Sequence, residues 1–171
     1  GLPSSVNITL QTGVNYLNVT GTDLNNVNSF TFNQPPSATS SLVVNIDASG
    51  TFNWDVWSQN NISLSTSPYV IYNFYNTTQL NIEGSNDIHG TVFAPYASVE
   101  KTTNKANING QLIATSLTHD GGENNCAEFI PEPPAPPVSN TPPTAIFTVN
   151  GPECLDNNEF VFNNTSNTAP S

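Results

Sequence analysis

The two histidines of the chain, His89 and His119, are the first residues to consider for chemistry, because imidazole is the commonest acid–base group near neutral pH. His119 precedes Asp120, and with a serine this pair would supply the residue types of a hydrolase triad. The sequence has no Gly-x-Ser-x-Gly turn to present a nucleophile. His89 occupies the variable position of an Ile-x-Gly motif, which predicts an outward, solvated side chain. No catalytic residues are therefore predicted.

Carboxylates are the alternative catalytic groups, since glycoside hydrolases use two of them at a fixed separation. The chain offers several acids, but nothing in their spacing selects a pair: Asp47, Asp55, Glu83 and Asp87. A lyase acting on acidic polysaccharides needs cations to bind its substrate, and this chain has two lysines and no arginine. A polysaccharide-processing enzyme is the least favoured class, and we predict that the protein is not an enzyme.

One short acidic loop predicts a candidate metal site. Asp120, Glu123 and Asn125 flank a pair of glycines, and hard oxygen donors in such a loop suit Ca²⁺. Residues 153–159 are similar in composition. Neither segment has EF-hand spacing, so a metal-free Asx/Gly turn between strands is the alternative for both. Two dispersed cysteines and two histidines do not predict zinc, and no other cofactor is expected.

Aromatic residues predict a candidate ligand surface. Trp54 and Trp57 form one cluster, and Tyr69 and Tyr72 belong to another. Exposed rings of this kind stack on sugars, whereas packing in the core is the alternative. Because residues at odd spacing on one strand point to opposite faces, we expect one of the two tryptophans at an edge or surface.

The charge balance excludes several classes of partner. The chain of 171 residues has 2 Lys+Arg against 13 Asp+Glu, for a net charge of -11. Nucleic acids and anionic lipid surfaces are bound through lysine and arginine, so neither is an expected partner. No apolar run approaches the ~20 residues of a membrane-spanning helix, so direct membrane insertion is not expected. The acidic composition rich in Asn, Thr and Ser indicates an extracellular protein.

Short strands must position these residues. Apolar and polar residues alternate at 6–10, 17–19, 30–32, 44–46, 62–64, 70–74 and 80–82, and helical spacing is absent. A repeat is also present, because Ile88-His-Gly-Thr-Val-Phe-Ala94 matches Ile108-Asn-Gly-Gln-Leu-Ile-Ala114. Such a strand–glycine–strand unit suits one rung of a β-helix, with Asn-rich turns that stack in ladders. The prediction is an all-β, solenoid-like module; a β-sandwich is the alternative.

A proline-rich segment sets the predicted domain boundaries. Residues 131–143 contain seven of the 14 prolines and favour extended polyproline II, which makes a semi-rigid linker of roughly 40 Å. Residues 1–130 are thus one module, and residues 144–171 begin another. Cys126 and Cys154 flank the linker, and a disulfide between them would clamp the two modules together. Spacing alone leaves that pairing open.

Residues 42–129 resemble the adhesin-like module called choice-of-anchor A. The strongest motif is Ile88-His-Gly-Thr-Val-Phe-Ala-Pro-Tyr-Ala97, followed by the repeat copy that begins at Ile108. Further matching pieces are 42–47, 70–78, 80–84 and 122–129. The resemblance implies a β-helical adhesive or stalk module of a large bacterial surface protein, not an enzyme. It also implies that further rungs precede residue 1.

Residues 142–166 resemble the start of a PKD-type immunoglobulin-like domain of the form found in Bacteroidetes surface proteins. The matching pieces are Pro142-Pro-Thr-Ala-Ile-Phe-Thr-Val149 and Cys154-Leu-Asp-Asn-Asn-Glu-Phe-Val-Phe-Asn-Asn-Thr-Ser166. The resemblance implies the first strands of an Ig-like β-sandwich, with Cys154 paired to a later cysteine.

Three functions are therefore compared. The favoured one is a secreted, non-enzymatic module of a bacterial cell-surface adhesin or surface fibre, which gives reach, rigidity and adhesion. Its partners would be other domains of the same long chain and glycans or host or neighbouring-cell surfaces. The second is a carbohydrate-binding module that uses the Trp/Tyr clusters. The third is the polysaccharide-processing β-helix enzyme.

Overall fold

The computed structural model describes residues 1–103, 105–130, 147–149 and 162–164. The chain divides into two compact units, residues 1–134 and 135–171. In the second unit, β14 (Phe147–Val149) pairs antiparallel with β15 (Phe162–Asn164). The rest of the PKD-like match lies outside the described residues.

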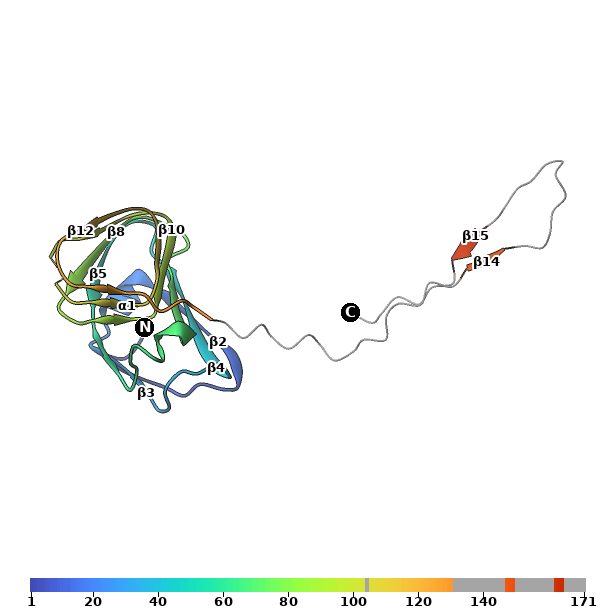
Figure 1. Ribbon diagram of the computed structural model, residues 1–171, viewed down its shortest axis with the longest axis horizontal. Helices are drawn as coiled ribbons and strands as arrows, with labels where there is room; N and C mark the ends of the chain where they lie inside the picture. The colour runs from blue at the N-terminus through green and yellow to red at the C-terminus, as the bar shows by residue number, and fades with distance from the viewer. Residues whose placement is uncertain (104, 131–146, 150–161, 165–171) are drawn as a thin grey trace. The chain divides into compact units, whose positions relative to one another are not determined.

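The first unit is a stack of short strands joined by turns (Figure 1). Its first half contains β1 (Ser5–Ile8), β2 (Gly13–Thr20), α1 (Gly21–Asn25), β3 (Ser29–Phe32), β4 (Ser40–Asp47), β5 (Gly50–Val56) and β6 (Ser58–Asn60). Its second half contains the 3-10 helix η1 (Ser67–Tyr69), β7 (Val70–Asn73), β8 (Thr77–Gly84), β9 (Ile88–His89), β10 (Thr91–Lys101), β11 (Ile108–Asn109), β12 (Leu112–His119) and β13 (Asn124–Asn125). The predicted all-β character is confirmed.

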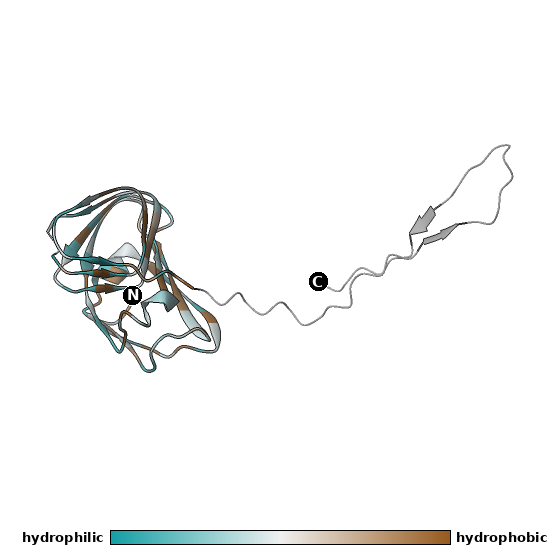
Figure 2. Ribbon diagram, in the orientation of Figure 1, coloured by the Kyte–Doolittle hydropathy of each residue, from teal (hydrophilic) through white to brown (hydrophobic). Residues whose placement is uncertain are grey.

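Parallel pairing shows that the module is a solenoid and not a β-sandwich. Its strands form three sheets within residues 1–130, and every strand pair in these sheets is parallel. The largest sheet runs β2-β4-β7-β10-β8-β5, with β12 also paired to β10. Because β10 pairs with β7 through its first half and with β8 through its second half, it bends around a corner of the coil. The alternation of hydrophobic and hydrophilic residues follows these strands (Figure 2).

The predicted repeat corresponds to two successive rungs. Ile88 is paired with Ile108, and Ala94 with Ala114, so both copies of the motif occupy equivalent positions. Earlier rungs are longer, because Asn45 pairs with residues 27 and 28 positions away in the rungs before and after it. The predicted run at 62–64 is wrong: it lies in the loop between β6 and η1.

Aromatic residues fill the interior of the coil. Trp54 is completely buried, and its ring lies 5.3 Å from that of Tyr72 and 5.2 Å from that of Phe74, measured between centroids. Trp57 is 3% exposed and packs against Phe30 at 4.1 Å. Tilted contacts of this kind combine large buried area with favourable ring electrostatics. This cluster is the centre of the core.

Asparagine ladders run along the outside of the stack, on the strands and not in the turns where the sequence predicted them. Asn73 donates to Oδ1 of Asn45, and Asn45 donates to Oδ1 of Asn18, each at 2.9 Å. A second ladder joins Asn81 to Asn53 at 2.7 Å. The first ladder ends at Asn73, because the residue paired with it in the next rung is Phe93 and not another asparagine. The buried Oδ1 of Asn73 has no hydrogen-bond partner among the described residues. Side chains thus hold the rungs in register alongside the backbone bonds.

Two glycines let successive rungs approach closely. A Cβ added to Gly110 would lie 2.0 Å from the carbonyl oxygen of Gly90, well inside contact distance. Gly90 itself has a φ of 132°, which favours glycine. The Ile-x-Gly repeat therefore keeps glycine at the position where the backbones of two rungs meet.

Replacing Trp54 with alanine should leave a cavity in the aromatic cluster, and we expect a loss of about 3–5 kcal/mol in the free energy of unfolding. Urea denaturation followed by tryptophan fluorescence would measure it. Tyr96→Ala is the matched control, because Tyr96 is 70% exposed and its loss should change stability by less than about 0.5 kcal/mol. Equal effects of the two changes would contradict the assigned core.

Replacing Asn45 with alanine should break two ladder bonds, whereas Asn18→Ala breaks only the terminal one. We expect losses of about 1–3 kcal/mol and about 0.5–1.5 kcal/mol respectively, since each such bond contributes roughly 1 kcal/mol. Chemical denaturation of both variants measures the two losses in the free energy of unfolding, and so their ratio. A larger loss for Asn18→Ala would show that the ladder does not carry the effect.

Candidate binding groove and neighbouring surfaces

The predicted aromatic ligand surface is wrong for three of its four residues. Trp54 and Tyr72 are 0% exposed and Trp57 is 3% exposed, while Tyr69 is half-buried at the end of η1. The expectation of one tryptophan at a surface fails because β5 ends at Val56 and the chain turns at the next residue. This corner directs Trp57 inward despite its odd spacing from Trp54.

Hydrogen bonds fix two of these rings, those of Trp57 and Tyr72, in the interior. The indole nitrogen of Trp57 donates to the carbonyl oxygen of Leu24 at 3.2 Å, which ties the corner after β5 to α1. The hydroxyl of Tyr72 donates to Oε1 of Gln59 at 3.2 Å, and burial raises the pKa of Tyr72 far above its ordinary value. Rings held in this way are not available to stack on a sugar.

His89 is half-buried, not freely solvated as the motif predicted. Its Nδ1 lies 3.4 Å from Oγ of Ser67 and 3.4 Å from Nδ2 of Asn109. Burial lowers the pKa of His89, and the nearby charge of Asp87 opposes part of that change. Ser67 is completely buried and donates its proton to the carbonyl oxygen of Ser63 at 2.9 Å, so it is not placed as a nucleophile. Sequence reasoning missed this Ser–His contact, because Ser67 and His89 lie 22 residues apart and form no local motif.

The acidic loop predicted to bind Ca²⁺ is held by both lysines of the chain. Nζ of Lys105 lies 2.8 Å from Oδ2 of Asp120 and donates to the carbonyl oxygen of Asp120 at 2.7 Å. Nζ of the buried Lys101 donates to the carbonyl oxygen of Gly121 at 3.1 Å. A hydrogen bond from Lys105 and its positive charge lower the pKa of Asp120. An ammonium group therefore engages the carboxylate of Asp120, one of the three ligands that the sequence suggested for a metal.

The other two predicted ligands have structural roles in the stack. The backbone N–H of Glu123 donates to Oδ1 of Asn107 at 2.8 Å, and the amide of Asn125 donates to Oδ1 of Asn109 at 2.9 Å. Within the residues that the structure describes, no group of three or more His, Cys, Asp or Glu is arranged to hold a metal ion. The Ca²⁺ site stays a prediction, and residues 153–159 lie outside the described residues.

The predicted disulfide also stays a prediction. Cys126 follows β13 and is exposed, whereas Cys154 lies outside the described residues.

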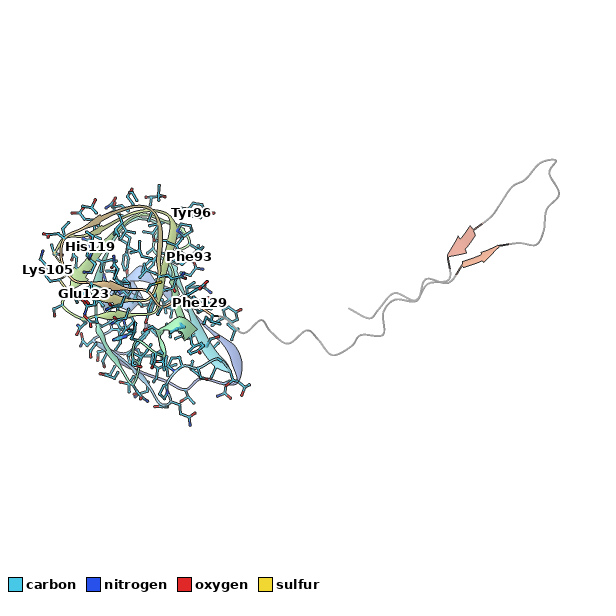
Figure 3. The ribbon with its side chains drawn as sticks, in the orientation of Figure 1. Phe93, Tyr96, Lys105, His119, Glu123 and Phe129 are labelled. Carbon is cyan, nitrogen blue, oxygen red and sulfur yellow. The ribbon has the colours of Figure 1, made fainter. Side chains whose placement is uncertain are left out.

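The last rungs carry different side chains on two sides of the module. Lys105, His119 and Glu123 lie on one side, and Phe93, Tyr96 and Phe129 lie on the other (Figure 3). Among the described helices, none is long and apolar enough to cross a membrane.

A groove of about 420 Å³ opens beside α1, at the turn between β4 and β5. Its lining mixes polar and apolar groups in similar proportion and comes from three segments, Thr20, Gly21, Thr22, Asn25, Asn26, Asp47, Ala48, Ser49, Thr51 and Phe52. The only charged side chain in this lining is that of Asp47, and the only aromatic ring is that of Phe52. We call this feature the α1 groove.

Neighbouring residues fix the walls of the α1 groove. Asn76 donates to Oδ1 of Asp47 at 2.6 Å and accepts from the backbone N–H of Ala48 at 3.0 Å. Asn25 donates to the carbonyl oxygen of Asn53 at 2.6 Å and accepts from the backbone N–H of Asp55 at 3.2 Å. One amide thus orients the carboxylate of the groove, and another anchors α1 to β5.

Gly21 allows the helix to rest against the aromatic floor of the groove. A Cβ at this position would lie 2.7 Å from Cε2 of Phe52 and 2.9 Å from Cβ of Ala48. Phe52 also contacts Phe74, with ring centroids 6.0 Å apart. Sequence reasoning missed this site because its residues come from separate segments and form no local motif.

Replacing Lys105 with glutamine should raise the pKa of Asp120 toward the ordinary aspartate value, because the hydrogen bond and the charge are both removed. A depressed pKa means that this pair stabilises the fold above the ordinary pKa and that the contribution is lost as pH falls through the lower one. Carboxyl ¹³C NMR titration measures the pKa directly. Lys105→Arg is the control and should keep it low. An unchanged titration in Lys105→Gln would rule out the pairing.

One comparison with known proteins assigns the solenoid to a family. A family model described as "Putative Ice-binding-like adhesive domain" matches residues 3–126, which is well over half of the chain. No curated protein and no solved structure matches the chain. The match supports an adhesin-like module with a surface or extracellular role, in agreement with the coarser part of the sequence prediction. The chain belongs to the ice-binding-like adhesive domain family.

Proposed function

We propose that this chain is a non-enzymatic adhesive module of a long bacterial cell-surface protein. One observation carries the proposal: the adhesive-domain match covers residues 3–126, and the solenoid runs from β1 at Ser5 to β13 at Asn125. The residues that the family model matches are therefore the same residues that form the solenoid. The resemblance of residues 42–129 to choice-of-anchor A, and of residues 142–166 to a PKD-like domain, belongs to this proposal.

The stacked rungs support a role in rigidity as well as contact. Each rung is bonded to the next by a parallel ladder, and the Asn18–Asn45–Asn73 ladder adds side-chain bonds at two of these steps. Nearest-neighbour stacking of this kind resists bending, because every rung buries its apolar face on the next. The module thus holds its surface groups in fixed positions, as an adhesive stalk requires.

The surface chemistry favours contact with uncharged partners. The net charge of -11 keeps the chain soluble and repels anionic surfaces. Glycans or neighbouring cell surfaces are the proposed partners, together with other domains of the same chain. The buried Trp/Tyr clusters take no part in this proposal.

Adhesion can be measured with the full chain attached to beads that are exposed to polysaccharide-coated, protein-coated and cell-coated surfaces under shear flow. We expect retention on at least one surface that exceeds the retention of beads carrying an unrelated protein of equal negative charge. Turnover of the polysaccharide by the same beads should be absent. Retention equal to the control on all surfaces, or hydrolysis of a polysaccharide, would overturn the proposal.

A further inference from the structure

We propose that the α1 groove binds a single neutral sugar ring and is the point at which the module recognises a glycan. This inference rests on the proposed adhesive function and names the ligand class for it. The volume of about 420 Å³ lies within the range of small-molecule sites.

The chemistry of the lining matches the chemistry of a sugar. A pyranose presents several hydroxyl groups around its edge and a band of C–H groups on each face. The carboxylate of Asp47 can accept from two adjacent hydroxyls, and bonds to a charged acceptor are stronger than bonds between neutral groups. The hydroxyls of Thr22, Ser49 and Thr51 and the amide of Asn26 line the same groove and can donate or accept. Phe52 offers the apolar surface that a C–H face requires.

The groove is already organised for binding. Asn76 holds one oxygen of Asp47 at 2.6 Å, so the carboxylate loses little freedom when a ligand binds. Phe52 is confined between Gly21 and Phe74. Asn25 anchors α1 through two hydrogen bonds to β5. A lining whose groups are already held in place lowers the entropic cost of binding a small, weakly held ligand.

Charge and shape separate a neutral sugar from other ligands. A phosphate, sulfate or uronate would meet Asp47, and neither lysine of the chain belongs to the lining. A calcium ion takes about six to eight oxygen ligands, and Asp47 is the only carboxylate in the lining to hold it. An apolar peptide side chain would find only Ala48 and Phe52 to contact.

Titration of the ¹⁵N-labelled full chain with the methyl glycosides of glucose, galactose, mannose and N-acetylglucosamine tests the site. We expect saturable shifts with at least one glycoside at the backbone amides of Thr22, Ala48, Ser49 and Thr51. Absence of shifts with all four at millimolar concentration, or shifts confined to other residues, would overturn the inference.

Two variants test the assigned contacts. Asp47→Asn should weaken binding of the responsive glycoside at least about tenfold, because it removes the charged acceptor. Glu128→Gln is its control, since Glu128 is an exposed acid that does not belong to the lining, and it should leave the affinity unchanged. Ser49→Trp should fill the groove and abolish binding, whereas Ser65→Trp, in an exposed loop, should not. Equal effects within either pair would argue against this groove.

Bead adhesion separates failure of this inference from failure of the adhesive function. If the unaltered chain adheres and Asp47→Asn and Ser49→Trp adhere equally well, the module is adhesive through another surface. If the unaltered chain does not adhere at all, the adhesive function itself fails. Loss of adhesion in both groove variants, with adhesion retained in both control variants, supports both the adhesive function and the sugar site in the α1 groove.

Discussion

Parallel stacking requires each side chain to lie above its counterpart in the previous rung, and the rest of the structure depends on this constraint. One inward column shows it clearly, because Phe52 is paired with Leu80, Leu80 with Val99, and Val99 with Leu117. Like residues in a column exclude water from the interior, and like amides in an outward column can bond to one another. Core and ladder are thus two results of the same register.

The sequence reveals this register only where rungs have equal length. The repeat at Ile88 and Ile108 was visible because no insertion separates its two copies, and it correctly predicted a solenoid. The earlier rungs contain α1, η1 and their loops, which lengthen them and hide the period. Alternation alone identified most strands there, but it also assigned a strand to the loop at 62–64.

The sequence does not predict where side chains point at the corners of the solenoid, or which residues from separate segments meet in one site. Strand geometry placed Trp54 and Trp57 on opposite faces, but a corner after Val56 brings both into the core. The acidic loop at Asp120 resembled a metal site in the sequence. Lys105, which donates to an oxygen of Asp120, lies 15 residues earlier in the chain, so no local pattern reveals the contact. The α1 groove needs contacts between α1, the β4–β5 turn and Asn76, and such contacts have no local signature.

The two ends of the Phe52 column show how a repetitive fold acquires a distinctive site. Leu80 and Val99 are 0% and 2% exposed in the middle of the column, whereas Leu117 is 40% exposed in the last described rung. At the other end, α1 packs beside Phe52, and α1 together with the β4–β5 turn surrounds its partly exposed ring with hydroxyls, amides and one carboxylate. A column that is purely apolar elsewhere thus ends in a groove that also carries polar groups. Because regular rungs present the same chemistry at every step, an interruption such as α1 is where a solenoid can present a unique combination of groups, and this is the physical reason to look for recognition there.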